Sequence, residues 1–171
     1  MKKLCILVLL AIILAPSYSQ SAEVISEVLE KETASYMDFS YLIASQLGLE
    51  CTPFEAYAWC ERFGTFPVAD KANSPITVKS ASQFFMVNYG LPGGLMWSAT
   101  HSPRYAWREL KHRKFWASGT DPDNELSGEE VVQAVSRFFE TYPDAALNVP
   151  PEAEADHKYR AMLLSDKEEA K

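Results

Sequence analysis

The sequence PITVKSASQFFMVNYGL, residues 75–91, decides the fold. Thr77 is a favoured helix N-cap, because its hydroxyl can accept a hydrogen bond from a backbone amide of the first turn. Phe84 and Phe85 follow at a spacing that places apolar residues on one side of a helix. Gly90 marks the end, since glycine readily adopts the left-handed conformation found after helix C-termini. The stretch predicts an amphipathic helix that buries its apolar side against other helices.

Two further helices of this kind are predicted, one on either side in the sequence. Ser35 and Asp38 supply an N-cap and an acidic third helical residue, and Gly48 suits the end of that helix. Ser127 and Glu130 have the spacing of a capping box, in which each side chain bonds the other residue's backbone amide. We therefore expect three capped helices, beginning near residues 35, 77 and 127.

A second type of helix follows the first two. Thr52-Pro53 and Ser102-Pro103 both combine an N-cap with proline at the first helical position. These helices are expected to reach about residues 63 and 114, and both contain Tyr-Ala-Trp, at 57–59 and 105–107. Residues 91–101 are expected to form a loop, because Pro-Gly-Gly cannot continue a helix. The repeated order of elements predicts stacked helix-loop-helix units. A chance likeness between amphipathic helices is the alternative.

At this point the chain resembles the S-layer homology (SLH) family over about residues 34–142. Its Pro-Ile-Thr at 75–77 is similar to the start of that family's Ile-Thr-Arg-Ala-Glu motif. Glu-Leu-Ser-Gly-Glu-Glu at 125–130 is similar to the same motif, and residues 118–123 resemble its Gly-Asp-Gly-Thr loop. The resemblance implies an all-α fold: a helical bundle of about three SLH-like helix-loop-helix repeats in a pseudo-three-fold arrangement. It also implies non-covalent anchoring to cell-wall polysaccharide. The family's ligand-contacting arginine, however, is replaced by Val78 and Gly128 here.

Residues 1–19 predict an export signal. Lys2 and Lys3 precede an apolar run over residues 4–15, which is shorter than the ~20 residues of a membrane span. A buried N-terminal helix is the alternative, and no transmembrane segment is expected after signal removal. The predicted organisation is a signal peptide at 1–19, a leading helix at 20–33, the SLH-like repeat domain at 34–144, and a linker, possible C-terminal helix and charged tail at 145–171.

The composition excludes some classes of function. The net charge of −7 argues against a nucleic-acid binder. Cys51 and Cys60 could form a disulfide in an oxidising compartment. A helix joining them would separate their Cα atoms by ~13 Å, whereas a disulfide needs them within ~7 Å. We therefore expect two unpaired thiols, with a bridge as the alternative.

No motif predicts catalysis, a cofactor or a metal site. The three histidines are scattered, and no Cys-x-x-Cys or Gly-x-Ser-x-Gly sequence occurs. Asp121, Asp123 and Glu125 alternate like the start of a calcium loop, but Leu126 and Val132 replace its glycine and its final glutamate.

The candidate partner-binding residues are Trp97, Arg104, Arg108 and Lys111. Residues 104–114 hold five basic residues and one acidic residue in an otherwise acidic chain. The i, i+4, i+7 spacing places the three cations on one helical face, and Trp97 lies in the preceding loop. This face suits an anionic envelope polymer, a lipid headgroup or an acidic protein surface. A solvated face paired with neighbouring carboxylates, and a packing role for Trp97, are the alternatives.

These observations predict an exported, non-catalytic cell-envelope module, periplasmic or envelope-associated, that mediates attachment or protein assembly. A periplasmic enzyme or accessory subunit is one alternative, and it would need two acidic side chains buried in one cleft. A small-ligand carrier that uses the aromatic residues is another.

Overall fold

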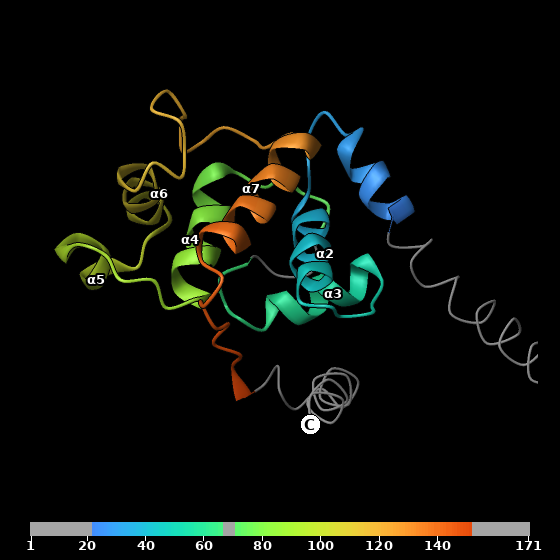
Figure 1. Cartoon of the computed structure of the whole chain (residues 1–171), viewed down its shortest axis with the longest axis horizontal. Coiled ribbons are helices and arrows are strands. Elements are labelled where there is room, and N and C mark those ends of the chain that lie inside the picture. Colours follow the sequence, from blue (N-terminus) through green and yellow to red (C-terminus); the bar gives the residue numbers. More distant parts are fainter. Residues whose placement is uncertain (1–21, 67–70, 152–171) are drawn as a thin grey trace, which may run out of the picture.

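The computed structural model describes residues 22–66 and 71–151, and this part of the chain is all-helical (Figure 1). A helix over residues 22–29 precedes α2 (Tyr36–Gln46), α3 (Pro53–Glu61), α4 (Val78–Asn88), α5 (Leu95–Thr100), α6 (Pro103–His112) and α7 (Gly128–Thr141). Within the described ranges the only β pairing is two isolated bridges, Ser35 with Pro75 and Thr77 with Glu125. The prediction of an all-α fold is confirmed.

The three central helices α2, α4 and α7 begin at their predicted caps. The hydroxyls of Ser35, Thr77 and Ser127 each accept a hydrogen bond from the amide of the third helical residue. The caps of α2 and α7 are complete capping boxes. Gly48 and Gly90 follow the C-caps of α2 and α4 with φ of 73° and 58°, a conformation that favours glycine. Local sequence therefore sets both ends of α2 and α4 and the start of α7.

The residues that precede these three caps bond to one another in a closed ring. The amide of Ala34 donates to the carbonyl oxygen of Leu126 at 2.8 Å. Leu126 donates to Ile76, and Ile76 donates to Ala34, both at 3.0 Å. All three residues are buried. Because each residue donates once and accepts once, the ring satisfies buried backbone groups that no helix or sheet serves.

A second set of three bonds lies two residues further along each segment. The first amide of each central helix has no partner within its own helix. Each donates instead to a carbonyl in the segment before another central helix: Tyr36 to Ser74 at 3.1 Å, Val78 to Asn124 at 3.0 Å, and Gly128 to Lys31 at 2.9 Å. The three helix starts are thus held together by backbone bonds between segments distant in sequence.

The same helical positions of α2, α4 and α7 face the core. The fourth and eighth residues of the three helices are all at most 1 % exposed: Phe39 and Ile43, Ala81 and Phe85, Val131 and Val135. Phe85 stacks on Phe138 of α7 with ring centroids 4.1 Å apart, and it also meets Phe39 of α2 at 5.5 Å. These aromatic contacts join the three central helices into one core.

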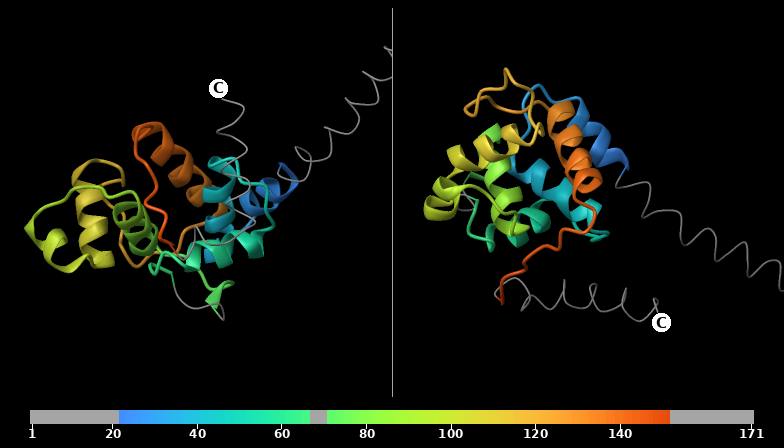
Figure 2. Two further views of the ribbon diagram at one scale, coloured as in Figure 1. Left: turned by 90° about the horizontal axis from the view of Figure 1, so that it is seen from below. Right: turned by 60° about the vertical axis from the view of Figure 1, so that its left-hand side comes forward.

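The remaining helices pack outside this centre. α3 lies against α2, and α6 lies against α4. The α5–α6 pair forms one end of the molecule, opposite α3 and the helix over residues 22–29 (Figures 1 and 2). The segment over residues 145–151, predicted to be a linker, packs on the core through Ala145, Leu147 and Val149.

Several predicted boundaries need correction. Residues 91–101 are not all loop, because α5 occupies Leu95–Thr100. Pro-Gly-Gly does lie between two helices, but a helix of six residues is too short to show a period in the sequence. α3 ends at Glu61 and α6 at His112, each two residues before its expected end, and the leading helix ends at residue 29. The predicted signal peptide and C-terminal helix lie outside the described residues.

Candidate functional site

The predicted basic face lies on α6 and consists of Arg104, Arg108 and Lys111. Arg104 and Arg108 are exposed, and Lys111 is half-buried. The guanidinium of Arg108 lies 5.7 Å from the centroid of the Tyr105 ring. The ammonium of Lys111 lies 4.5 Å from the centroid of the Trp107 ring. Two of the three cations are therefore held against aromatic rings of their own helix, an attraction that stays weak at exposed sites.

The basic face has no acidic partner in the part of the chain that the structure describes. Lys31 and Asp38 form an ion pair at 2.7 Å, and Lys79 pairs with Asp123. No carboxylate lies within 4 Å of the charged atoms of the basic face in residues 22–66 and 71–151. Since neighbouring carboxylates do not neutralise this face, its positive charge is available to a partner.

The neighbouring contacts use neutral acceptors. Lys111 donates to the carbonyl oxygen of Thr120 at 3.4 Å, and Arg113 donates to the carbonyl oxygen of Pro92. Ala106 and Leu110 are fully buried on the opposite side of α6. α6 is therefore an amphipathic helix with a cationic outer face.

Trp97, the fourth predicted residue, lies in the interior with 3 % of its surface exposed. Its indole N–H donates to the carbonyl oxygen of Leu91 at 3.3 Å, and its ring meets His101 edge-on at 4.9 Å. A Cβ at Gly93 would lie 2.3 Å from the Trp97 ring, so this turn requires glycine. Trp97 anchors α5 and does not present its ring to solvent.

Two exposed residues of α5 are absent from the predicted partner-binding residues. Leu95 is 84 % exposed and Met96 is 51 % exposed. They directly precede the buried Trp97. A run of three large apolar residues in a six-residue helix is the signal that could have found them, because so short a helix buries only one side.

The start of α5 lies beside the C-terminal half of α6 (Figure 2). A Cβ at Gly94 would lie 3.1 Å from a carboxylate oxygen of Glu109. The bond from Arg113 to Pro92 ties the same two segments. Leu95 and Met96 therefore share the α5–α6 end of the molecule with the basic face.

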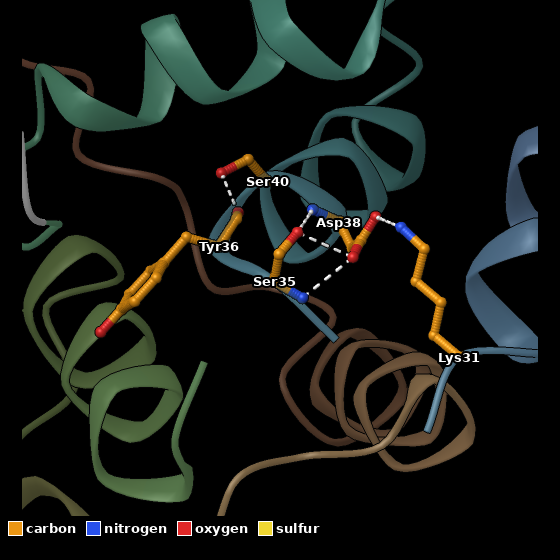
Figure 3. A network of polar contacts seen from close by, with 5 residues as sticks. All are labelled: Lys31, Ser35, Tyr36, Asp38 and Ser40. Atoms are coloured by element: carbon orange, nitrogen blue, oxygen red, sulfur yellow. Dashed lines mark hydrogen bonds and ion pairs between the residues drawn. The ribbon is translucent and has the colours of Figure 1, made fainter. Parts of the chain in front are cut away.

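Among the described residues, the acidic side chains form no buried pair. Asp121, Asp123 and Glu125 are all exposed, so they are not the buried acid pair that the enzyme hypothesis needs. Asp38 is buried, but its oxygens accept from the amide and hydroxyl of Ser35 and from Lys31 (Figure 3). Asp38 thus serves the cap of α2. No group of three His, Cys, Asp or Glu side chains suited to a metal occurs in the described residues.

Cys51 and Cys60 are not joined by a disulfide. Burial raises the pKa of the Cys60 thiol to about 12. That thiol is therefore protonated at neutral pH and enclosed by protein, whereas Cys51 is partly exposed.

Comparison of the chain with models of known families, with curated proteins and with solved structures gave no match. None of the described helices is long and apolar enough to cross a bilayer.

Proposed function

We propose that this protein is an exported, non-catalytic cell-envelope module that mediates attachment or protein assembly through the α5–α6 end. The proposed export rests on residues 1–19, which have the basic start and short apolar run of a signal peptide. The proposed attachment rests on one observation in particular: the basic face of α6 is exposed in an acidic protein and has no carboxylate partner in the described chain.

We further propose that the fold consists of about three SLH-like units in a pseudo-three-fold arrangement. The closed ring through Ala34, Ile76 and Leu126 supports this, because each unit contributes the same position relative to its cap. The matching buried positions of α2, α4 and α7 support it as well. α3 and α6 would be the second helices of the first two units.

The attachment surface of this module would differ from that of the family it resembles. The motif arginine of that family corresponds to Val78 and Gly128, which are both buried. A Cβ at Gly128 would lie 1.7 Å from the carbonyl oxygen of Val28, so the leading segment covers this position. A polymer could not reach either residue. The basic face of α6 is then the better attachment surface.

Retention on envelope fractions tests the proposal. We expect Arg104→Glu/Arg108→Glu/Lys111→Glu to lose most of the retention of the wild type, because it reverses the charge of the basic face. Lys71→Glu, at an exposed lysine away from α6, is the matched control for adding a glutamate and should be retained like the wild type. Equal retention of the triple variant and the wild type would remove the proposed role of this face.

A further inference from the structure

We infer that the α5–α6 end docks on an anionic phospholipid surface, with Arg104, Arg108 and Lys111 against the headgroups and Leu95 and Met96 in the boundary with the acyl chains. This inference rests on the proposed function and names the partner of the same surface. It combines two features of one end of the molecule: cations without carboxylate partners in the described chain, and large apolar side chains exposed at the same end.

The apolar contribution comes from the first turn of α5. Leu95 has the largest exposed fraction among the exposed large hydrophobic residues of the described chain, and Met96 is its neighbour. Trp97 is buried and holds the helix in place through its bond to Leu91. The apolar pair is thus presented on a short, anchored helix. Removing such side chains from water favours insertion at a membrane interface.

The electrostatic contribution comes from α6 and the turn that follows it. Arg113 and Lys114 are exposed and follow α6 in the sequence, so five cations lie within residues 104–114. Glu109 is the only acidic residue of that stretch, and it lies beside the start of α5. Clusters of four to eight cations next to an apolar anchor are recognised by anionic lipid headgroups.

The aromatic side chains argue against a polysaccharide as the partner. Sugar rings bind by stacking on open aromatic faces. Trp97 is buried, Lys111 lies over the Trp107 ring, and Arg108 lies over the Tyr105 ring. This end therefore exposes cations and the apolar side chains of Leu95 and Met96, while Arg108 and Lys111 cover the Tyr105 and Trp107 rings.

The small apolar area of Leu95 and Met96 argues against a stable protein partner. A standard protein interface takes ~20–30 residues on each side and has an apolar centre. Two side chains do not make such a centre, but they are enough to penetrate a headgroup layer when several cations act with them. A lipid surface can contact both the cations and the apolar side chains of this end.

Vesicle co-sedimentation tests the inference on the full chain as it is expressed, with its N-terminus determined by mass spectrometry. The probes are phosphatidylcholine vesicles with and without phosphatidylglycerol. We expect the wild type to bind the anionic vesicles more strongly, and added salt to weaken that binding. Because two lysines precede the apolar residues 4–15, a retained N-terminal segment would itself favour anionic vesicles. The difference between the wild type and the basic-face variant, which share the same N-terminus, therefore reports the basic face.

Two variants separate the two contributions. Arg104→Gln/Arg108→Gln/Lys111→Gln should weaken binding to the anionic vesicles ~100-fold, at about a fivefold loss per cation. Leu95→Asn/Met96→Gln should weaken binding several-fold and leave its salt dependence unchanged. Circular dichroism establishes that each variant is folded, and Lys71→Gln is the control for losing a cation elsewhere.

The outcomes distinguish this inference from the proposed function. Equal binding to both kinds of vesicle, or no binding to either, would overturn the lipid inference. If envelope retention still depended on the basic face, the proposed function would stand with another partner. If polygalacturonate, a soluble anionic polymer, bound the wild type and anionic vesicles did not, the partner would be a polymer. Loss of vesicle binding in both variants, with Lys71→Gln unchanged, supports lipid docking.

Discussion

The centre of the molecule buries its backbone polar groups and its aromatic side chains, whereas the α5–α6 end exposes both charged and apolar side chains. In the centre, buried backbone amides bond across the ring of Ala34, Ile76 and Leu126, and aromatic rings fill the space between helices. At the α5–α6 end, Leu95 is exposed to solvent, and no carboxylate of the described chain pairs with the basic face. Packing in the centre therefore stabilises the fold, whereas the side chains exposed at the α5–α6 end can contact a partner.

The helix starts show the same contrast. The caps of α2, α3 and α7 are complete capping boxes. The N-cap of α5 is Gly94, which has no side chain, and the N-cap Ser102 makes no side-chain bond to α6. The α5–α6 end is therefore less firmly set by local sequence, and it depends on Trp97 and the contact of α6 with α4.

The largest expected effect comes from opening the aromatic core. Phe138→Ala should lower the free energy of unfolding by ~3–5 kcal/mol, because Phe138 is fully buried and stacks on Phe85. Denaturant unfolding followed by circular dichroism measures the change. Phe54→Ala is the matched control: Phe54 is 62 % exposed, and its loss should change stability by less than ~0.5 kcal/mol. Similar effects of the two substitutions would contradict the placement of the core.

A smaller effect is expected at the contact between α7 and the leading segment. Gly128→Ala would bring a Cβ within 1.7 Å of the carbonyl oxygen of Val28, so one backbone must move. The bond from Gly128 to Lys31 would be strained as well. We expect a loss of ~1–3 kcal/mol in the free energy of unfolding, and faster amide exchange over residues 22–32.

Gly119→Ala is the control for this substitution. No atom lies within 4 Å of a Cβ at Gly119, so stability should stay within ~0.5 kcal/mol of the wild type. If Gly128→Ala unfolded at the same denaturant concentration as Gly119→Ala, the leading segment would not be packed against the start of α7.

The smallest effect is expected from removing one cap in each region. Ser127→Ala deletes the hydroxyl that accepts from the amide of Glu130, and it should cost ~1 kcal/mol of stability. Ser102→Ala deletes a hydroxyl that makes no capping bond, and it should be nearly neutral. Thermal unfolding of the two variants side by side measures the difference. A larger loss for Ser102→Ala would reverse the contrast between the two regions.

Much of the fold could be predicted because its signals are local. The caps at Ser35, Thr77 and Ser127 and the glycines after α2 and α4 act within one helical turn of their own position. Sequence therefore located the starts of the central helices. The outer helices α3 and α6 end two residues before their expected ends, because the last turn gives way to turn and bend backbone.

The candidate site could be predicted only in part. The basic face was visible because its three residues recur at helical spacing on α6. Leu95 and Met96 were missed, because a loop was expected where α5 forms. Trp97, predicted to bind a partner with a packing role as the alternative, lies inside, since a short segment does not reveal which of its apolar side chains turns inward.

The sequence by itself determined the all-helical class, the helix caps and the basic face of α6, because each depends on residues within a few positions of one another. Only the tertiary structure decided that the three helix starts share a ring of backbone hydrogen bonds. It also decided that Trp97 is buried while Leu95 is exposed, and that no described carboxylate pairs with the basic face. Those features depend on which distant segments meet, and packing of the whole core sets that choice.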